Sequence, residues 1–383
     1  MAGPCTRSLL GVAAGHAGRD ELGVFPPPLW GRAREGGLNA KTLGYVLACL
    51  ALGVRMMPAA RRLGVAAVLI VACVLPFLVT GYLLFQFTLV IITAIALLGL
   101  NILTGFNGQL SLGHGAFYAI GAYTTAILVE TTGMPACATI PLAGAAGLVV
   151  GTLFGIPALR LEGHYLALAT FALAVAMPQL LKFRGLEPWT GGVQGIVVAK
   201  LEAPSWLPLD SDQWLYLLSL AIAVAMFLIA SNLLRGRVGR ALKAIRDHPA
   251  AATAMGIDTA RYKSIAFGVS AMYTAIAGAL GALAAQFVSP DSFSFFLSIS
   301  LLVGMVVGGI ASISGAIYGA VFVVYVPNLA DAVTKAAPWA VYGMVLIGCM
   351  VAMPRGISGL VGTLAQSLAA RARSLRATDR DSA

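Results

Sequence analysis

Long apolar runs alternate with short polar segments from about residue 62 to residue 354. A helix rises about 1.5 Å per residue, so about 20 apolar residues cross the roughly 30 Å hydrocarbon core of a bilayer. The runs approach this length and predict about ten membrane-spanning helices, within a range of eight to eleven. The candidate spans lie near residues 62–80, 82–103, 113–129, 136–157, 165–183, 213–234, 264–286, 297–311, 316–328 and 339–353.

The composition agrees with a chain built mostly of such spans. Of the 383 residues, 59% are hydrophobic and 10% are charged, whereas about 25% of the residues of a soluble domain are charged. The expected fold class is an all-α integral membrane protein, a polytopic helical bundle. The cysteines are scattered singly without a C-x-x-C pair, which favours small buried apolar residues over metal or redox chemistry. They are Cys5, Cys49, Cys73, Cys137 and Cys349.

Three parts are expected along the chain. Residues 1–55 begin with a segment rich in glycine, arginine and proline that lacks periodicity, so we expect a disordered or untranslated extension, with Met56 or Met57 as the true start. Residues 56–362 hold the spans, and residues 363–383 form a basic tail.

The charged loops predict an orientation, because lysine and arginine near span ends are retained on the cytoplasmic side of a membrane. The loop at residues 235–263 carries seven basic and two acidic residues and is expected to be cytoplasmic. The loop at residues 184–212 carries four acidic and two basic residues, with tryptophans suited to an interface, and is expected outside. The chain's net charge of +10 therefore reflects topology and does not indicate nucleic-acid binding.

Glycines recur at intervals of four residues in several of the spans. Small residues let helix backbones approach one another in lipid, so this spacing predicts close helix packing and contact with a partner subunit, although glycine is also simply frequent in membrane helices. The candidate packing residues are Gly147, Gly151, Gly155, Gly304, Gly308, Gly315 and Gly319.

The segment from Leu103 to Phe117 interrupts an apolar run with four glycines and several hydrogen-bonding side chains. In hydrocarbon, such groups survive only against protein or a water-filled cavity. In one interpretation, Gly105 and Gly108 break a helix beside a solute pathway. In the other, which the expected topology favours, the segment is a tight cytoplasmic turn and Ser111 caps the next span. The candidate pathway residues are Asn107, Gln109, Ser111 and His114.

No catalytic or metal-binding constellation is recognisable in the sequence. His114 and His164 lack the neighbouring glutamate or carboxylates of a zinc site, so packed or interfacial histidines are expected. The sequence has no Gly-Lys dipeptide and hence no phosphate-binding G-x-x-x-x-G-K-[ST] loop. We therefore expect a transport subunit without its own ATPase site. The alternative is a self-sufficient secondary transporter or channel, against which the scarcity of ionisable residues in the spans counts.

One segment of the basic loop, from Arg246 to Gly256, has the features of a complete short helix. Asp247 or His248 suits the N-cap, Pro249 suits the first turn, the alanines favour helix, and Gly256 suits the end. Such a short helix is marginal in water, so it needs either a cytoplasmic partner on which to dock or an anionic lipid surface. Its residues are Pro249, Ala250, Ala251, Ala252, Thr253, Ala254, Met255 and Gly256.

In combination, several motifs between about residues 60 and 362 resemble the permease subunits of branched-chain amino acid ABC importers, of the LivM type. The most characteristic is the glycine-rich run from Gly105 to Tyr123, GFNGQLSLGHGAFYAIGAY. The others are LRLEGHYLALAT at residues 159–170, TGGVQG at 190–195, GRALKAIR at 239–246, AMGID at 254–258, RYKSIAF at 261–267, GMVVGGIASISGAIYG at 304–319 and PRGISGL at 354–360.

The resemblance implies a multi-pass subunit of the bacterial inner membrane. With ten spans, the basic residues before the first span and after the last both lie inside, so a cytoplasmic C-terminus is expected. The resemblance also implies three kinds of partner besides membrane lipid: a homologous second permease of the LivH type, two cytoplasmic ABC ATPases and an extracytoplasmic solute-binding protein. ATP and magnesium would be bound by the ATPases, with no cofactor on this chain. The loop at residues 235–263 would couple ATP-driven closure of the ATPases to the membrane helices.

Two positions of the coupling segment depart from the family's pattern. Pro249 and Thr253 stand where many members carry other, often charged, residues, so charge pairing with the ATPase is not predicted here. The spans also lack a convincing pair of buried charges that could bind the carboxylate and the ammonium of a zwitterionic amino acid. Branched-chain amino acids, urea, short amides and other small organic solutes all stay open as substrates.

Overall fold

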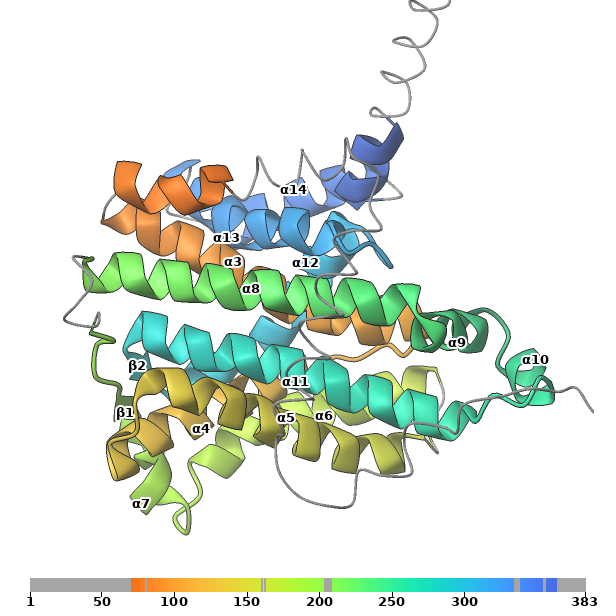
Figure 1. The fold of residues 1–383 in the computed structure, drawn as a ribbon, viewed down its shortest axis with the longest axis horizontal. Coiled ribbons are helices and arrows are strands. Elements are labelled where there is room, and N and C mark those ends of the chain that lie inside the picture. Colours follow the sequence, from red (N-terminus) through yellow and green to blue (C-terminus); the bar gives the residue numbers. More distant parts are fainter. Residues whose placement is uncertain are drawn as a thin grey trace, which may run out of the picture. The chain divides into compact units, whose positions relative to one another are not determined.

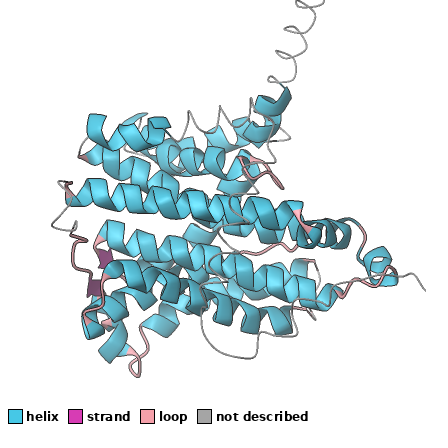
Figure 2. Cartoon of the chain, viewed as in Figure 1, coloured by secondary structure: helices cyan, strands magenta, loops and turns pink. Residues whose placement is uncertain are grey.

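The computed structural model describes residues 70–79, 81–159, 161, 163–202, 209–333, 338–353 and 356–363. The chain divides into two units between Leu47 and Ala48, and every described residue belongs to the second unit. Nearly all of that part is helical (Figures 1 and 2). The expected N-terminal extension, the alternative start site and nearly all of the basic tail lie outside the described residues.

The long helices run between the two ends of a bundle, and shorter elements occupy the ends. The long helices are α3 (Tyr82–Leu100), α4 (His114–Thr132), α5 (Ala136–Ala158), α6 (His164–Leu181), α8 (Ser211–Arg235), α11 (Thr259–Ala285), α12 (Phe295–Gly308), α13 (Gly315–Val333) and α14 (Pro338–Ala352). The short elements are the π-helix η1 (Asn101–Phe106), α7 (Glu187–Thr190), η2 (Gly192–Gln194), β1 (Ile196–Val197), α9 (Arg237–Asp247), α10 (Pro249–Ala254), β2 (Phe287–Val288) and η3 (Pro290–Phe293). Residues 70–78 and 356–363 are also helical.

Each of the ten predicted spans overlaps one of these helices, which confirms an all-α polytopic membrane protein. Among the described residues, six helices are long and apolar enough to cross a membrane, and α12 is a shorter apolar helix. With 19 residues, α4 is long enough but is not one of the six, since it carries many glycine, threonine and tyrosine residues.

Helix α11 is the centre of the bundle and packs against α3, α4 and α5 (Figure 1). In its most apolar 18-residue window, 83% of the residues are buried, compared with 28% for α8. The buried face of α11 consists mainly of alanine, glycine, serine and threonine. These small side chains let the neighbouring helices approach closely, which supplies the packing that holds helices together in lipid.

The candidate packing glycines lie at two helix pairs. A Cβ at Gly147, Gly151 or Gly155 would meet atoms of α11, at residues Ser264 to Ala275. A Cβ at Gly304 of α12 would meet the backbone of Gly319 of α13, and a Cβ at Gly308 would meet that of Gly315. A Cβ at either glycine of α13 would likewise meet the backbone of α12. All of these close approaches are within the chain.

Asn101 joins the end of α3 to the turn between α12 and α13. Its side chain is fully buried; Nδ2 donates to the carbonyl oxygen of Ser312 at 2.7 Å, and Oδ1 accepts from the backbone N–H of Ala311 at 2.8 Å. Ala311 has a positive φ of 58°, which is unusual for a residue with a Cβ. The amide thus stabilises a turn whose backbone is otherwise unfavourable.

We expect Asn101→Leu to destabilise the folded chain by about 2–3 kcal/mol. The change removes both hydrogen bonds of a fully buried amide and leaves the N–H of Ala311 without its acceptor. The measurement is the thermal midpoint of the purified protein in detergent. Asn328→Leu is the control, because within the described residues the exposed Asn328 bonds to a carbonyl of its own helix, that of Val324. Equal midpoints for the two variants would contradict this role.

The expectation that the cysteines are buried is wrong for two of them. Cys73 and Cys137 are exposed on the surface of the described bundle, and Cys349 is half-buried. In a membrane protein the outer surface faces lipid, so an apolar residue gains nothing from burial inside the bundle. Cys5 and Cys49 lie outside the described residues.

Candidate functional site

The chain between α3 and α4 forms a break at the end of the bundle that carries the basic loop. The last turn of α3 widens into η1, and residues 107–113 are almost entirely non-helical before α4 begins at His114. Gly108 has a positive φ of 76°, the conformation that glycine adopts without strain. Thr104 Oγ1 donates to the carbonyl of Gln109 at 3.0 Å and closes the turn.

The four candidate pathway residues are all buried, and they form two separate pairs. Asn107 Nδ2 donates to Gln109 Oε1 at 2.8 Å, and both residues line a cavity. Ser111 and His114 form a second pair at 3.0 Å, away from the cavity lining and against α11. The structure therefore does not bring the four side chains together at one site.

His114 lies in a chain of hydrogen bonds that links α4 to α11 and α3. Ser270 donates its only hydroxyl hydrogen to the carbonyl of Gly99 at 2.6 Å, so the 2.7 Å contact with His114 requires Nε2–H as the donor. In the neutral ring, Nδ1 is then free to accept from Ser111. His114 is therefore a packed histidine, as expected, and its contacts hold the start of α4 against α11.

The start of α4 uses groups from other helices in place of a local cap. The N-cap residue is Gly113, which has no side chain to cap the helix, so the interpretation of Ser111 as the cap is wrong. The backbone N–H of Gly115 instead donates to Ser298 Oγ of α12 at 2.9 Å, and that of Leu112 donates to Thr170 Oγ1 of α6 at 2.9 Å. These bonds satisfy backbone groups that would otherwise be buried without partners.

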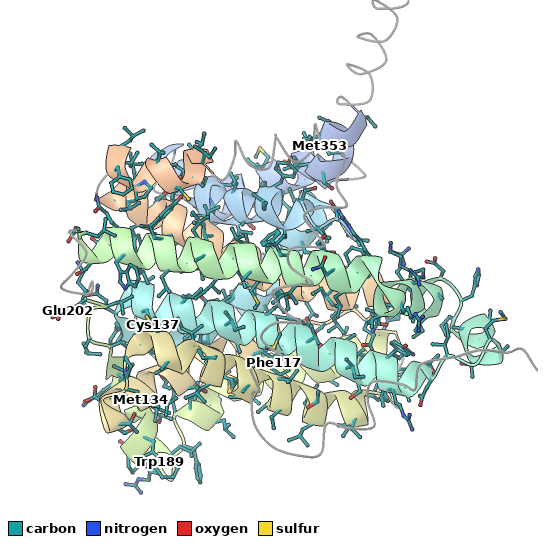
Figure 3. All side chains as sticks on the ribbon, viewed as in Figure 1. Phe117, Met134, Cys137, Trp189, Glu202 and Met353 are labelled. Carbon is teal, nitrogen blue, oxygen red and sulfur yellow. The ribbon has the colours of Figure 1, made fainter. Side chains whose placement is uncertain are left out.

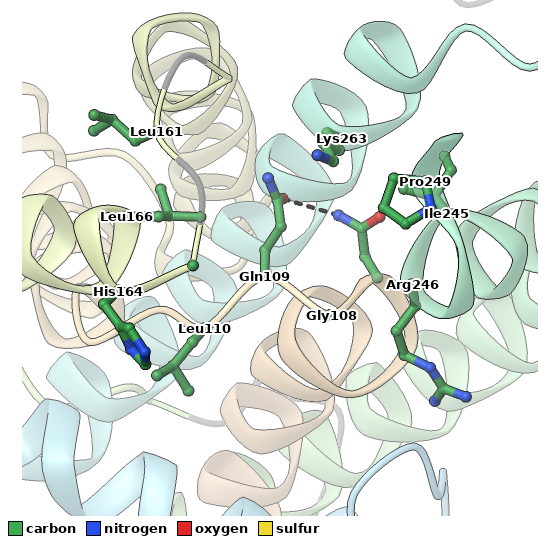
Figure 4. Close-up of a pocket in the computed structure, with 12 residues that line it drawn as sticks. Gly108, Gln109, Leu110, Leu161, His164, Leu166, Ile245, Arg246, Pro249 and Lys263 are labelled. Carbon is green, nitrogen blue, oxygen red and sulfur yellow. Dashed lines mark hydrogen bonds between the residues drawn. The ribbon is translucent and has the colours of Figure 1, made fainter. Parts of the chain in front are cut away.

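The cavity beside Asn107 and Gln109 has a volume of about 350 Å³. It lies between the break, the start of α6 and the junction of α9 with α10, and Gln109 and Lys263 extend into it from different elements (Figure 4). The residues around it are Asn107, Gly108, Gln109, Leu110, Leu161, Gly163, His164, Leu166, Ile245, Arg246, Pro249 and Lys263. None of these described lining residues is acidic. Of the two histidines considered from the sequence, His164 is exposed at this cavity.

The basic loop contacts the break directly through α9. Arg246 Nη1 donates to the carbonyl of Gly105 at 3.0 Å, and the ammonium of Lys243 lies 5.6 Å from the ring centroid of Phe106. Helix α9 is amphipathic, with Leu242 and Ile245 buried and basic residues on the other face. Sequence reasoning missed this helix, although its apolar residues at helical spacing were a usable signal.

The predicted short helix is present as α10, with His248 at the N-cap and Pro249 in the first turn. It is joined to the bundle by short connections on both sides and lies at its tip (Figure 1). Among its residues only Ala252 is buried, and Met255, just after the helix, is 84% exposed. Gly256 has a positive φ of 80° and open space around it, as expected for a residue that ends a helix.

The opposite end of the bundle carries a small, partly apolar surface. β1 and β2 pair in antiparallel fashion, and Lys182 Nζ lies 2.6 Å from Asp291 Oδ1. Trp189, Val193 and Val197 are each more than 60% exposed there, and Trp189 projects from the surface in Figure 3. Nearby, Lys200 pairs with Asp212 at 2.9 Å, and this hydrogen bond raises the pKa of the lysine.

Among the described residues, no group of three or more histidine, cysteine, aspartate or glutamate side chains is arranged to hold a metal ion.

Comparison with known proteins gives consistent matches over most of the chain. The family described as "Branched-chain amino acid transport system / permease component" matches residues 82–354. The high-affinity branched-chain amino acid transport system permease protein LivM of Salmonella typhimurium is 35% identical over 289 residues, which are 69% of this chain and 67% of that protein. LivM of Escherichia coli strain K12 is 34% identical over 289 residues, with the same coverage. The permease protein LivH of the same strain is 25% identical over 284 residues, 70% of this chain and 91% of LivH. No solved structure matches the chain.

Proposed function

Because the chain belongs to the family of branched-chain amino acid transport system permease components, we propose that it is the transmembrane subunit of an ATP-binding cassette importer in a bacterial inner membrane. It pairs with a homologous second permease of the LivH type. Two ATPases bind its cytoplasmic end and hold the ATP and magnesium, and an extracytoplasmic binding protein delivers the solute at the other end. The solute is a branched-chain amino acid or a related small organic molecule.

The observation that carries this proposal is the exposed helix α10 at the tip of a basic loop. A helix of six residues is marginal in water. Its surface is small and almost uncharged, which suits insertion into a groove of another protein better than adsorption to anionic lipid. The loop at residues 235–263 is thus the cytoplasmic coupling loop, and the positive-inside rule places the C-terminus on the same side.

The contacts of α9 provide a route for movement from the ATPases to the membrane helices. A displacement of α10 acts on α9, and α9 contacts η1, which continues α3, through Arg246 and the carbonyl of Gly105. On its other side, α10 leads within a few residues to the start of α11, the central helix. By moving α10, ATP binding to the partner subunits can therefore shift this bundle from one arrangement of its helices to another.

The other end of the bundle suits the docking of a solute-binding protein. Trp189, Val193 and Val197 form an exposed apolar surface, and exposed apolar side chains in a polar surround are typical of protein contact sites. This surface belongs to the loop at residues 184–212, which the charge pattern places outside the cell.

The test is affinity purification of the chain from its native membrane in mild detergent, followed by mass spectrometry and reconstitution in liposomes. We expect recovery of a second permease and two ATPases, and uptake of a branched-chain amino acid that depends on ATP and on the binding protein. A solitary chain that catalyses uptake in liposomes without ATP would contradict the proposal and favour a secondary transporter.

A further inference from the structure

The cavity beside the break carries basic residues without a matching acid. Lys263 and Arg246 line it, and none of the described lining residues is acidic. The guanidinium of Arg246 is paired with Asp247 at 2.9 Å and donates to the carbonyl of Gly105. Lys263 is half-buried and belongs to none of the ion pairs among the described residues. One positive charge at this cavity is therefore left without a partner.

Gln109 provides an unused hydrogen-bond donor at the same cavity. The residue is only 7% exposed, and its Oε1 accepts from Asn107. The Nε2 group carries two further N–H donors, which have no acceptor among the described residues. Unlike Asn107 Oδ1, Nε2 is not a fully enclosed atom, and the side chain extends into the cavity together with Lys263 (Figure 4). The amide and the ammonium therefore both favour a negatively charged acceptor.

The start of α6 adds backbone donors to the cavity wall. Its N-cap residue, Gly163, has a positive φ of 56° and no side chain that could accept from the first N–H groups of the helix. Gly163, His164 and Leu166 all line the cavity, so the positive end of an 18-residue helix lies at its wall. Backbone groups at such an end bind phosphate or carboxylate oxygens. Three elements, the break, α6 and α11, thus contribute donors to one space.

The remainder of the wall is apolar, and the cavity adjoins a surface that faces lipid. Leu110, Leu161 and Leu166 line it. Beside it on α6, Tyr165 is 72% exposed and Leu168 is 63% exposed. Tyrosine is enriched at the headgroup level of a membrane, where its ring is amphipathic like its surroundings. A ligand with an anionic head and an apolar body fits this position better than a wholly polar ion.

We propose that the cavity binds the phosphodiester group of an anionic phospholipid, such as phosphatidylglycerol, from the cytoplasmic leaflet. The phosphate contacts Lys263, Gln109 and the start of α6, and the apolar part of the lipid contacts the leucines. A phosphodiester has one negative charge, which matches the single unpaired charge of Lys263, whereas a phosphate monoester carries about 1.5–2. Basic pockets between helices at the cytoplasmic side of a membrane are typical sites for anionic headgroups. The inference goes beyond the proposed function, because it assigns a lipid site to this chain.

The bound headgroup has a consequence for coupling. Pro249 of α10 and Gly108 of the break both line the cavity, so the lipid contacts the coupling loop and the break together. We expect ATP-driven uptake in phosphatidylcholine proteoliposomes to increase severalfold when phosphatidylglycerol is added. The variant Lys263→Gln is expected to lose this dependence, and a full response in that variant would contradict the role of the cavity.

The direct test is isothermal titration of dihexanoyl phosphatidylglycerol, a short-chain lipid, into the delipidated permease and ATPase complex in detergent. We expect saturable binding that weakens about tenfold or more in Lys263→Gln and in Gln109→Glu. The second change keeps the oxygen that accepts from Asn107 and replaces the free donor with a carboxylate. Arg261→Gln is the matched control, because it removes a nearby positive charge whose side chain is 83% exposed and paired with Asp258. Unchanged binding in Lys263→Gln, or an equal loss in Arg261→Gln, would overturn the proposal.

Ligand analogues test the same contacts in the unaltered complex, so their result does not depend on the folding of a variant. Dihexanoyl phosphatidylcholine has the same chains with a compensating cation, and inorganic phosphate has no chains. Each is expected to bind at least about tenfold more weakly than the phosphatidylglycerol. Equal binding of inorganic phosphate would assign the cavity to a soluble phosphate, and equal binding of phosphatidylcholine would show apolar adsorption. Either result would contradict the proposal.

The full chain purified alone separates this inference from the proposed function. Because all the described lining residues belong to this chain, it is expected to bind the lipid without the ATPases. Lipid binding by a chain that recruits no ATPase would refute the proposed function and support the lipid site. ATP-driven uptake by a complex that binds no phosphatidylglycerol would refute the lipid site alone.

Discussion

Replacing Ala251 with tryptophan is expected to abolish ATP-driven uptake while the protein still inserts into the membrane. Ala251 is exposed on α10, so a large side chain there disturbs no packing within the described chain. It does prevent a close fit between α10 and a groove on the ATPase. A contact at the centre of an interface commonly contributes about 2 kcal/mol or more, equivalent to roughly thirtyfold in affinity. Adding a bulky residue at Gly256 strengthens the effect, because a side chain at a φ of 80° is also strained.

The measurement is uptake of radiolabelled leucine by proteoliposomes containing the full complex, together with co-purification of the ATPases. Thr132→Trp is the control, since Thr132 is an exposed helical residue at the opposite end of the bundle. Both variants should appear in the membrane in normal amounts, and only Ala251→Trp should lose the ATPases. Normal uptake by Ala251→Trp would contradict the proposal that α10 docks on the ATPase.

Replacing Gly121 with valine is expected to prevent stable folding of the bundle. A Cβ at Gly121 would overlap the backbone carbonyl of Ala275, and a Cβ at Gly278 would overlap the carbonyl of Tyr118. At this crossing of α4 and α11 the obstacle is backbone, which cannot rotate away as a side chain can. Relief requires the two helices to separate, and overpacking of this kind costs about 3 kcal/mol or more.

The matched control for this prediction is Gly348→Val in α14, where a Cβ would meet no atom of the described residues within 4 Å. Both substitutions place a β-branched residue in a helix, so the cost of helix propensity is the same and cancels in the comparison. The measurement is the thermal midpoint of each purified variant in detergent. Similar midpoints would show that the crossing of α4 and α11 adapts to the added volume.

The sequence pattern was sufficient to locate a helix at each of the ten predicted spans in the described part of the chain, because each span must satisfy its backbone hydrogen bonds internally and must be apolar along its length. The short helix α10 was also predictable, since Pro249 and Gly256 mark its two ends by their own backbone preferences. These features are local, and each can be read from a few neighbouring residues.

The contacts between distant parts of the chain were not predictable in this way. Glycine spacing pointed to residues such as Gly147 and Gly304, but it gave no reason to choose Gly121, whose importance comes from the carbonyl of Ala275. Lys263 was counted as a topology signal and as part of a family motif, and nothing in the sequence indicated that it lines the cavity beside Gln109. The separation of the four candidate pathway residues into two pairs likewise depends on where α11 passes.

The modest hydrophobicity of α4 has a consequence for the biogenesis of this protein. A translocon releases a helix into lipid according to its apolar content, and α4 alone is poorly suited to that step. Only residues 133–135 separate α4 from α5, and α5 is long and apolar enough to cross a membrane. The two helices are therefore suited to enter the bilayer as a hairpin. Final packing of α4 must wait until α11, more than a hundred residues later in synthesis, supplies the hydroxyl of Ser270 that is the partner of His114 in its first turn.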